Sequence, residues 1–578
     1  MGCRSLVSAI CPSALRLSSL RQVVVTIFMM AATSPVAAQP AIALPAGPII
    51  HDAEHQILAA QNGERWAADD AKIEQRLQGF LKRNAGRPPN IIYILLDDLG
   101  FGEIGMPNLS VVRGYKTPNI DALARQGMAF QRMYSEPSCT PTRVAMMTGR
   151  YAVRTGLSEA KATIAGEGLA AEEVTLAEIL GDTGYYTSHV GKWHMGDIAQ
   201  AYASNQGFMH AEFPIHQQGQ LAIMHGDTED ADIIRGVDPA GAAQTFTLDK
   251  AFVANPSDMV TGVELRDGKL FEVDLKAGEK WSQKKYREMN ERYQAHALEQ
   301  LRTLAKRGEP FFLNYWPLFP LTFTRTDIKE FKTLNGGTIA ESIVEVDEWI
   351  GDIVEEVDRL GLGENTIIVV MGDNGPFMQY LGPTGASDRI YRGGKTDHLE
   401  GGVRVNAYMR WRGMIEPGSS AEDIIHVSDL FTTFARLAGA LDRVPRDRII
   451  DGVDQSGVFL LGETHGRRDY VHIYEGPTLK SVVKNKYKMH MVPPGENPIG
   501  APIFDLYRDP REERPEESIK YGPWAGGQFA AMVKRHLMMK MKYPDRKPTY
   551  GKVYEGIENL RPETKAVVKV FEMSQLKK

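Results

Sequence analysis

The sequence predicts an α/β protein in which a large mixed, mostly parallel sheet is sandwiched by helices, with a smaller C-terminal α+β subdomain on an antiparallel sheet. Three observations lead to this fold class. Apolar runs alternate with stretches of helical period along most of the chain. The runs are continuously apolar, as in strands that are buried on both faces. Beyond about residue 465 the strand-like runs become short and follow one another closely.

The first predicted strand is the apolar run at residues 91–96, which stops abruptly at two aspartates. A helix is expected at 117–126, because Thr117 can cap it and Pro118 suits its first position. The clearest helix covers 339–360, where apolar residues spaced by three or four form a single stripe. The other predicted elements of the large domain are strands at 185–190, 311–316, 366–371 and 403–411 and a helix at 282–307.

Composition and periodicity also suggest where the parts of the chain begin and end. A chain of 578 residues is too long to fold around one ordinary hydrophobic core, which predicts a large domain plus a smaller one. We expect short strands at 481–491 and 503–507 and a helix at 528–542 in the smaller part. The predicted boundaries are a signal peptide at 1–38, a lead-in at 39–87, a catalytic domain at 88–464 with a rim insertion at 198–281, and a C-terminal subdomain and tail at 465–578.

The first 38 residues have the pattern of a secretory signal peptide. Three arginines and no acidic residue precede an apolar run at 23–33, which is too short to span a bilayer, and small residues follow at 36–38. An uncleaved anchor or a lipid-modified Cys11 is the alternative. No later apolar stretch is long enough for a membrane helix, so we expect no membrane insertion after cleavage and a periplasmic or secreted product.

Charge and cysteine content narrow the possible functions further. Lys and Arg number 67 against 73 Asp and Glu, a net charge of -6, which gives no electrostatic reason to expect a nucleic-acid partner. Cleavage of the leader removes two of the three cysteines and leaves Cys139. A lone cysteine is more often a small buried apolar residue than a nucleophile, so its neighbours must decide between the two roles.

Two predicted strands end in oxygen ligands. One is followed by Asp97 and Asp98, and the other by Asp373 and Asn374. In an open α/β sheet, ligands bind at the carboxyl ends of the strands. Three carboxylates and an amide, without histidine, favour a hard divalent cation, Ca²⁺ first and Mg²⁺ as the alternative. The alternative structural role for these side chains is the capping of turns.

Cys139 precedes a predicted helix. Pro141 suits the first turn of that helix, which places Cys139 at the positive end of the helix dipole. Arg143 follows one turn later and can pair with an anion held there. A nucleophile, a helix N-terminus, an arginine and a divalent cation together predict a site for an anionic ester.

These motifs resemble those of the sulfatase family, in the alkaline-phosphatase-like superfamily. The run Cys139-Thr140-Pro141-Thr142-Arg143 is similar to the family's Cys-x-Pro-x-Arg signature, and Thr148-Gly149-Arg150 to its extension. The resemblance covers roughly residues 88–510 in family order. The other similar blocks are Gly191-Lys192-Trp193-His194, Gly372-Asp373-Asn374-Gly375-Pro376, Gly393-Gly394-Lys395, Glu400-Gly401-Gly402-Val403-Arg404 and His426-Val427-Ser428-Asp429-Leu430.

The resemblance implies a specific chemistry at the site. A formylglycine-generating enzyme would convert Cys139 to formylglycine, and the hydrate of that residue would be the nucleophile. Arg143 would stabilise the modified side chain. One divalent cation, usually Ca²⁺, would bind beside it. The metal ligands implied by the resemblance are Asp97, Asp98, Cys139 as formylglycine, Asp373 and Asn374.

The remaining catalytic roles that the resemblance implies fall on three residues. Lys192 and Lys395 would neutralise sulfate oxygens as charge develops, and His194 would act as the base that releases sulfate. Taken alone, each lysine would more often be a solvated surface residue, and His194 could be an ordinary partly buried histidine. Their places beside an apolar strand or in a glycine-rich turn favour the functional roles.

One position departs from the family pattern. Many members have a histidine in a Pro-His element after the strand that corresponds to 311–316, and here Leu321 follows Pro320. Leucine cannot donate a proton. The acid would then be Lys395 or a histidine of the insertion, or the leaving group needs little help, which favours aryl sulfates. The insertion histidines are His210, His216 and His225.

Three functions remain open at the level of sequence. The first is an exported sulfatase that hydrolyses a small-molecule or glycan sulfate ester. The second uses the same nucleophile and metal on phosphonate monoesters or phosphodiesters, which are near isosteres of sulfate esters. The third is a non-catalytic binder of sulfated glycans, which only Leu321 supports. We expect the loops at 198–281 and 376–400 to select the substrate.

Overall fold

The computed structural model describes most of the chain beyond the predicted leader, and its described part belongs to one compact unit, residues 44–578. The leader itself lies outside the described residues. Within the described part, no helix is both long and apolar enough to cross a membrane. The described residues are 47–161, 164–215, 219, 222–223, 229–230, 258–260, 262–266, 269–320, 330, 332–334, 337–377, 390–491 and 500–575.

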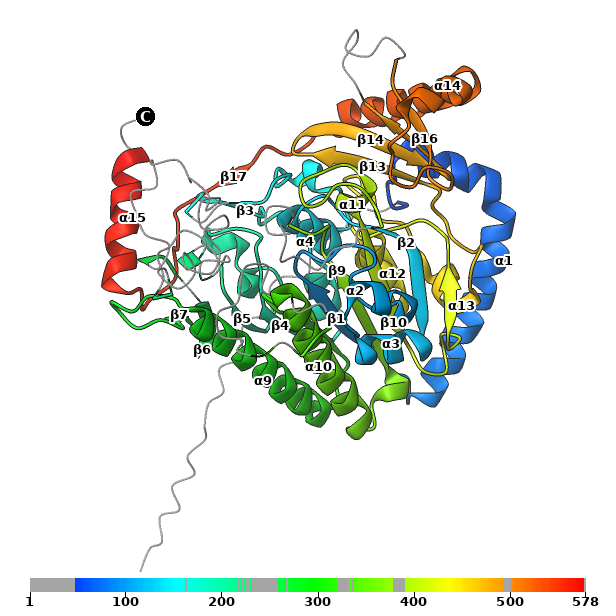
Figure 1. Cartoon of the computed structure of the whole chain (residues 1–578). Coiled ribbons are helices and arrows are strands. Elements are labelled where there is room, and N and C mark those ends of the chain that lie inside the picture. Colours follow the sequence, from blue (N-terminus) through cyan, green and yellow to red (C-terminus); the bar gives the residue numbers. More distant parts are fainter. Residues whose placement is uncertain are drawn as a thin grey trace, which may run out of the picture. The chain divides into compact units, whose positions relative to one another are not determined.

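A large mixed sheet forms the centre of this unit, in the strand order β11-β2-β10-β9-β1-β8-β4-β5-β6-β7, with β12 paired to β2 (Figure 1). The run from β9 through β5 is parallel, whereas β10, β6 and β7 pair antiparallel, which confirms the predicted mostly parallel sheet. The strands are β1 (Asn90–Leu96), β2 (Met128–Tyr134), β4 (Tyr186–Gly191), β5 (His210–Phe213), β6 (Gly262–Arg266), β7 (Lys269–Val273), β8 (Phe311–Trp316), β9 (Thr366–Gly372), β10 (Arg404–Arg410), β11 (Ser419–Ala421) and β12 (Ile425–His426).

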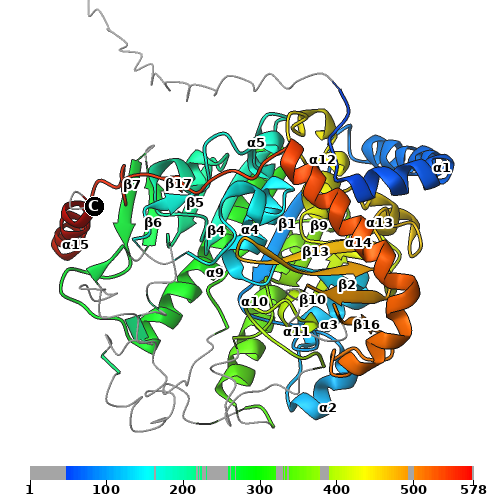
Figure 2. The same ribbon diagram turned by 90° about the horizontal axis from the view of Figure 1, so that it is seen from above.

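Helices cover both faces of this sheet and create two cores (Figure 2). Strand β1 shows why its sequence is continuously apolar: Tyr93 and Leu95 point into one core, and Ile94 and Leu96 into the other. The apolar stripe predicted at 339–360 packs into the second core. The helices are α2 (Ser110–Arg113), α3 (Pro118–Arg125), α4 (Cys139–Thr148), α5 (Leu176–Gly181), α9 (Gln283–Arg307), α10 (Thr338–Arg359), α11 (Glu400–Val403), α12 (Asp429–Leu437) and α13 (Ser456–Leu461).

A separate four-stranded sheet is built entirely of antiparallel pairs, as predicted for the C-terminal part. The single strand expected at 481–491 is wrong, because Asn485 adopts a left-handed conformation (φ 52°) and turns the chain into a hairpin. The helix expected at 528–542 begins ten residues earlier. These elements are β13 (Tyr470–Glu475), β14 (Thr478–Lys484), β15 (Tyr487–His490), β16 (Ile503–Asp505), α14 (Ser518–Lys542) and α15 (Pro562–Gln575).

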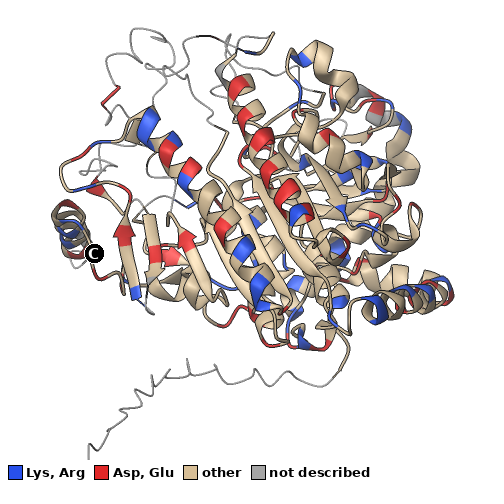
Figure 3. Cartoon of the chain, turned by 90° about the horizontal axis from the view of Figure 1, so that it is seen from below, with Lys and Arg blue, Asp and Glu red and all other residues tan. Residues whose placement is uncertain are grey.

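The lead-in and the insertion are more regular than the sequence indicates. The lead-in is one long helix, α1 (Ala53–Arg83), capped by the side chain of Asp52 and packed on α13 and α14. The described residues of the 198–281 segment include β5, β6 and β7, which extend the edge of the large sheet instead of lying over its rim. A two-stranded ladder joins β3 (Glu167–Gly168) to β17 (Thr549–Tyr550). Basic and acidic residues are interspersed along the helices seen from below (Figure 3).

Candidate active site

The metal-ligand candidates meet where two neighbouring parallel strands end. Leu96 of β1 lies opposite Gly372 of β9, so the residues that follow each strand are adjacent. The backbone N–H of Asp98 donates to Oδ1 of Asp373 at 3.0 Å, and the N–H of Asp373 donates to the Leu96 carbonyl at 2.9 Å. Asp98 itself has a left-handed backbone (φ 56°), which turns its carboxylate back toward the strand ends.

Cys139 is the first residue of α4 and lies against this carboxylate group. Its Sγ is 3.9 Å from Oδ1 of Asp98, and its side chain is 0% exposed. One ligand atom from each of Asp97, Asp98, Cys139 and Asp373 lies within 4.8 Å of the others. The hydroxyl of Thr142 donates to the Asp373 carbonyl at 2.6 Å and thereby fixes the first turn of α4 to the end of β9.

Arg143 reaches the same carboxylates from the next turn of α4. Its Nη2 donates to Oδ2 of Asp373 at 2.8 Å and to Oδ1 of Asp97 at 3.3 Å, and its Nη1 donates to the Lys192 carbonyl at 3.0 Å. The guanidinium lies 5.0 Å from the ring centre of Trp316, the last residue of β8. The arginine is completely buried, so these contacts replace its hydration.

Two lysines complete the charge balance. Nζ of Lys192 lies 2.6 Å from Oδ1 of Asp97, and Nζ of Lys395 lies 2.6 and 2.9 Å from the two oxygens of Asp98. Gly191 permits this placement of Lys192, because its φ is 108° and a Cβ there would lie 2.1 Å from the Trp316 carbonyl oxygen. Three carboxylates and three cationic side chains therefore share one buried space.

The electrostatics of these groups follow from burial and neighbouring charge. Burial opposes ionisation of Asp97, but Lys192, Lys395 and Arg143 outweigh it and hold the pKa of Asp97 below its usual range. Burial and the neighbouring Asp97 charge raise the pKa of Asp373. Burial raises the pKa of the Cys139 thiol to about 12 despite the nearby lysines, so an unmodified thiol is a poor nucleophile at neutral pH.

The donor set fits a hard divalent cation. Nδ2 of Asn374 donates to Oδ1 of Asp98 and to the Gly375 carbonyl, both at 2.8 Å. Its Oδ1 has no hydrogen-bond partner among the described residues, although Asn374 is completely buried. A buried amide oxygen without a partner beside three carboxylates is the set of donors that Ca²⁺ or Mg²⁺ prefers. A bound cation would satisfy the Asn374 oxygen and lower the pKa of Asp373.

His194 follows the end of β4 in an unusual backbone conformation. It lies two residues beyond Lys192 in a left-handed conformation (φ 61°), and its Nε2 is 3.2 Å from the Lys161 carbonyl oxygen. Its role as a base therefore stays a prediction. The nearby His189 is a core residue, because its Nε2 lies 3.0 Å from the Gly191 carbonyl oxygen and burial lowers its pKa to about 3.

Residues around the site differ in whether they face it or pack in the core. Phe377 lies beside the site, since Nζ of Lys395 is 5.3 Å from its ring centre, whereas Phe319 packs on Trp349 in the second core. His210 pairs with Glu212 on β5, which lies between β4 and β6 in the large sheet. Leu321, His216 and His225 lie outside the described residues.

Sequence reasoning missed two residues that shape the site. Trp316 packs against Arg143, and its signal was an aromatic residue at the carboxyl end of a predicted strand. Thr142 lies within the cysteine motif, but nothing in the sequence indicates that its hydroxyl reaches the carbonyl of Asp373. An α/β sheet that gathers a thiol, cations and carboxylates at its carboxyl edge has the architecture of a hydrolase for anionic esters.

Comparison with known proteins identifies the family. A family model described as Sulfatase matches residues 89–440. Arylsulfatase A from Bos taurus is 31% identical over 457 residues, 74% of this chain and 83% of the relative. Steryl-sulfatase from Rattus norvegicus is 28% identical over 529 residues, 78% of this chain and 89% of the relative. The chain therefore belongs to the sulfatase family of the alkaline-phosphatase-like superfamily and is a sulfuric ester hydrolase.

Solved structures agree on the fold. The crystal structure of the PsFucS1 sulfatase from Pseudoalteromonas sp. superposes with a TM-score of 0.69 at 24% identity. The superposition covers 83% of this chain and 96% of that one. The mixed sheet between two layers of helices is thus the fold of a known sulfatase.

Proposed function

We propose that the protein hydrolyses sulfate monoesters, with aryl sulfates favoured, through a formylglycine derived from Cys139. The observation that carries the proposal is the position of the buried Cys139 side chain at the start of α4. Its Sγ and one carboxylate oxygen each of Asp97, Asp98 and Asp373 lie within 4.8 Å of one another. Because burial raises the pKa of the thiol to about 12, the residue suits conversion to another nucleophile better than direct attack.

Asp97, Asp98, Asp373 and Asn374 would hold the divalent cation, Ca²⁺ in preference to Mg²⁺. The cation would supply Lewis-acid polarisation of the sulfate and of the hydrated formylglycine. The support for this assignment is the buried Asn374 oxygen without a partner and the absence of nitrogen ligands from the four residues.

The cationic side chains would bind and orient the sulfate. The ammonium group of Lys192 lies beside Asp97 and that of Lys395 beside Asp98. A sulfate between the two lysines would accept hydrogen bonds from both. Arg143 is held rigid by two carboxylates and the Lys192 carbonyl, so it can fix the position of residue 139. His194 would take up the proton when sulfate leaves.

Lys395 would also protonate the leaving oxygen, in place of the histidine that the family pattern has at Leu321. Its ammonium lies next to Phe377, at the point where the site meets the 376–400 loop. Burial favours the neutral amine, but the neighbouring carboxylates raise the pKa of Lys395, so its ammonium is a poor proton donor. A phenoxide leaves with little protonation whereas an alkoxide needs more, which supports aryl sulfates. The relatives include arylsulfatase A beside steryl-sulfatase and N-acetylgalactosamine-6-sulfatase, so the preference rests on the site and not on them.

We also propose that residues 1–38 direct export and are removed, leaving a periplasmic or secreted enzyme with a catalytic domain at 88–464. The support is the arginine-rich start, the short apolar run and the small residues before the cut. N-terminal peptide mass after expression in the source organism tests this point, and retention of the leader would contradict it.

The test of the function compares one aryl group carried as a sulfate, as a phosphate diester and as a phosphonate monoester. The protein is co-expressed with a formylglycine-generating enzyme, and conversion of Cys139 is measured by peptide mass. We expect the sulfate to be the preferred substrate, with turnover lost in Cys139→Ala. Equal turnover by the unconverted thiol protein would refute the formylglycine nucleophile.

A preference for the phosphate diester or the phosphonate monoester would instead show that the protein is a hydrolase of phosphorus esters. A converted protein that binds aryl sulfates without turning over any of the three esters would support the binding function. The matched control is His465→Ala, which removes a half-buried histidine that pairs with Asp69 on α1 and contacts none of the site residues. It should retain full turnover of the preferred ester.

A further inference from the structure

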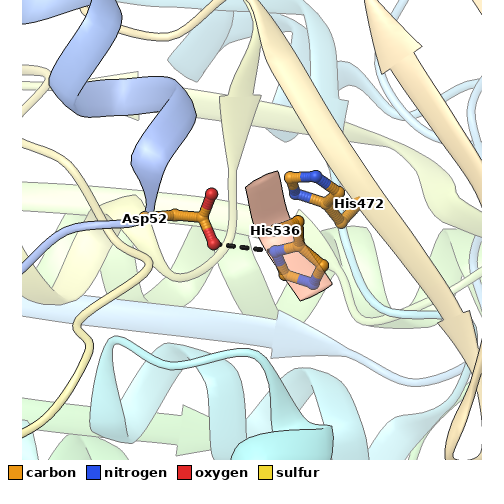
Figure 4. Close-up of side chains that lie close together, drawn as sticks. All are labelled: Asp52, His472 and His536. Carbon is orange, nitrogen blue, oxygen red and sulfur yellow. Dashed lines mark hydrogen bonds and ion pairs between the residues drawn. The ribbon is translucent and has the colours of Figure 1, made fainter. Parts of the chain in front are cut away.

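A second cluster of metal-ligating side chains lies outside the active site. Figure 4 shows Asp52, His472 and His536, which come from the cap of α1, from β13 and from α14. A carboxylate oxygen of Asp52 and one ring nitrogen of each histidine lie within 4.8 Å of one another. Each of the three residues is only 1% exposed.

His472 is the member of this cluster that lacks a partner. Both of its ring nitrogens are buried, and neither has a hydrogen bond within the described part of the chain. The ring stacks on His536 with centroids 3.8 Å apart and an interplanar angle of 16°. A buried imidazole with two unsatisfied nitrogens is costly, and a ligand at one nitrogen would remove much of that cost.

His536 has the surroundings of a metal-binding histidine. Its Nδ1 lies 2.7 Å from Oδ2 of Asp52, and its Nε2 lies 2.5 Å from the hydroxyl of Tyr474. Lys540 donates to the same hydroxyl at 3.3 Å. Histidines that bind metal through one nitrogen usually hydrogen-bond through the other, which fixes the tautomer and the ring. Tyr474 is placed to provide that second contact.

The charges around the cluster leave room for a cation. Asp52 is joined by two further buried carboxylates, Asp451 and Asp429. Opposite them are the guanidiniums of Arg154, 3.2 Å from Asp52 and 2.7 Å from Asp451, and of Arg468, 2.6 Å from Asp429. Lys540, which contacts Tyr474, is balanced by Asp545 at 2.7 Å. With neutral imidazoles, these groups together leave one negative charge in excess, which favours a bound cation over an empty polar pocket.

We propose that Asp52, His472 and His536 bind one divalent transition-metal ion of the zinc type, separate from the active-site cation. Two imidazole nitrogens and one carboxylate oxygen suit zinc, whereas Ca²⁺ and Mg²⁺ prefer oxygen alone. A tetrahedral zinc ion holds its ligand atoms roughly 3.3 Å apart. Asp52 and His536 therefore separate slightly, His472 rotates toward them, and water takes the fourth position.

The site would act on structure, because it is buried and joins three segments that are remote in the sequence. Two other clusters, Glu212 with Glu264 and His296 and Asp397 with His398 and Glu475, also gather ligand atoms. In both of those the imidazole already pairs with a carboxylate and the histidine is partly exposed. Neither leaves a buried nitrogen that requires a partner, which is why we assign the ion to the His472 cluster.

The test is the zinc content of the full chain. The thiol of Cys139 could also hold zinc, so every protein carries Cys139→Ala. After incubation with zinc and desalting, we expect about one zinc per chain in this parent. His472→Gln, which keeps the size and polarity of the side chain, should bind at least tenfold less, whereas His465→Ala should bind as much zinc as the parent.

Cobalt gives a second measurement that does not depend on stability. The parent loaded with Co²⁺ should show the intense visible absorption of a tetrahedral site, and His472→Gln should lose it. Failure of the parent to retain zinc would overturn the proposal and leave ordered water as the occupant. Equal zinc and an unchanged cobalt spectrum in His472→Gln would overturn it as well.

Discussion

The active site and a second buried network both place lysine among carboxylates, but they differ in which atoms lack partners. In the second network, Nζ of Lys488 on β15 lies 3.1 Å from Glu400 and 3.3 Å from Glu512, and all three side chains are 0% exposed. The remaining carboxylate oxygens are taken by Tyr134, Arg404 and His490. The active site keeps an amide oxygen, on Asn374, without a partner.

This difference separates a network that holds the fold together from one that is prepared for a ligand. A saturated network has nothing left to bind, so removing a member leaves a buried charge behind. An unsaturated one gives up some stability in exchange for a free ligand atom. Substitutions in the two regions should therefore separate activity from stability.

The largest effect is expected for Cys139→Ala in the active site. Loss of the nucleophile should lower kcat for an aryl sulfate by about 10⁴-fold or more. The side chain lies next to charged groups and makes only a 3.9 Å contact with Asp98, so the melting temperature should change little. Thermal unfolding beside steady-state kinetics measures both, and a large loss of stability would remove the contrast with the Lys488 network.

Lys488→Met should show the opposite pattern. Removing the ammonium deprives the buried Glu400 and Glu512 of the cation they share, which costs about 3–5 kcal/mol of unfolding free energy. Chemical denaturation measures this loss. The kcat of the protein that remains folded should be unchanged, and a parallel fall in kcat would show that the two networks are coupled.

Lys395→Met tests the same substitution within the active site. We expect kcat to fall by about 10²–10³-fold, because a charge that stabilises the transition state is lost. Stability should fall less than in Lys488→Met, since Asp98 keeps the hydrogen bond from Asn374 and, when present, the cation. Equal destabilisation by the two substitutions would show that the active-site network is also structural.

The smallest effect concerns Glu136, three residues before Cys139, which is a buried carboxyl group without a cation. Burial raises its pKa from 4.5 to about 8, while its Oε1 accepts a bond from the Ala152 N–H. The folded state therefore keeps a proton that the unfolded state loses. Stability from this group is complete below pH 4.5 and should fall by about 1.4 kcal/mol per pH unit above it, until the folded carboxyl group ionises near pH 8. A single pH unit therefore changes stability less than Lys488→Met does.

Glu136→Gln keeps the acceptor and removes the titration, so the variant should lack this pH dependence. The measurement is the unfolding free energy of both proteins at several pH values. Parallel curves would mean that Glu136 is ionised in the folded protein.

The sequence predicted the catalytic half of this comparison better than the structural half. Asp97 and Asp373 each follow a strand, and Cys139 begins a helix. Because parallel strands have their carboxyl ends at one edge of the sheet, these positions are predictable without knowing the loop conformations. The contact of Lys488 with Glu400 joins residues 88 apart on different elements. This contact depends on the hairpin at Asn485, where the sequence predicts a single strand.

The edge of the large sheet shows the same limit. The residues of β6 and β7 have weak periodicity, so their own pattern does not predict that β6 pairs with β5 and β7 with β6. Val263 and Leu270 of these strands pack into the first core, where Ile557 from the far end of the chain also lies. Trp316 was visible only as an aromatic residue at a strand end. Local sequence thus places the reacting groups, whereas contacts between distant segments set the surroundings.

The contact between Asp52 and His536 also constrains when the N-terminal part of the chain can complete its folding. These residues are 484 positions apart, so the cap of α1 has its partner only after nearly the whole chain has been synthesised. Until α14 arrives, the apolar side of α1 at Leu58 and Trp66 lacks part of its packing. A polypeptide truncated before α14 would leave this part of α1 without its partner and therefore more accessible to proteases.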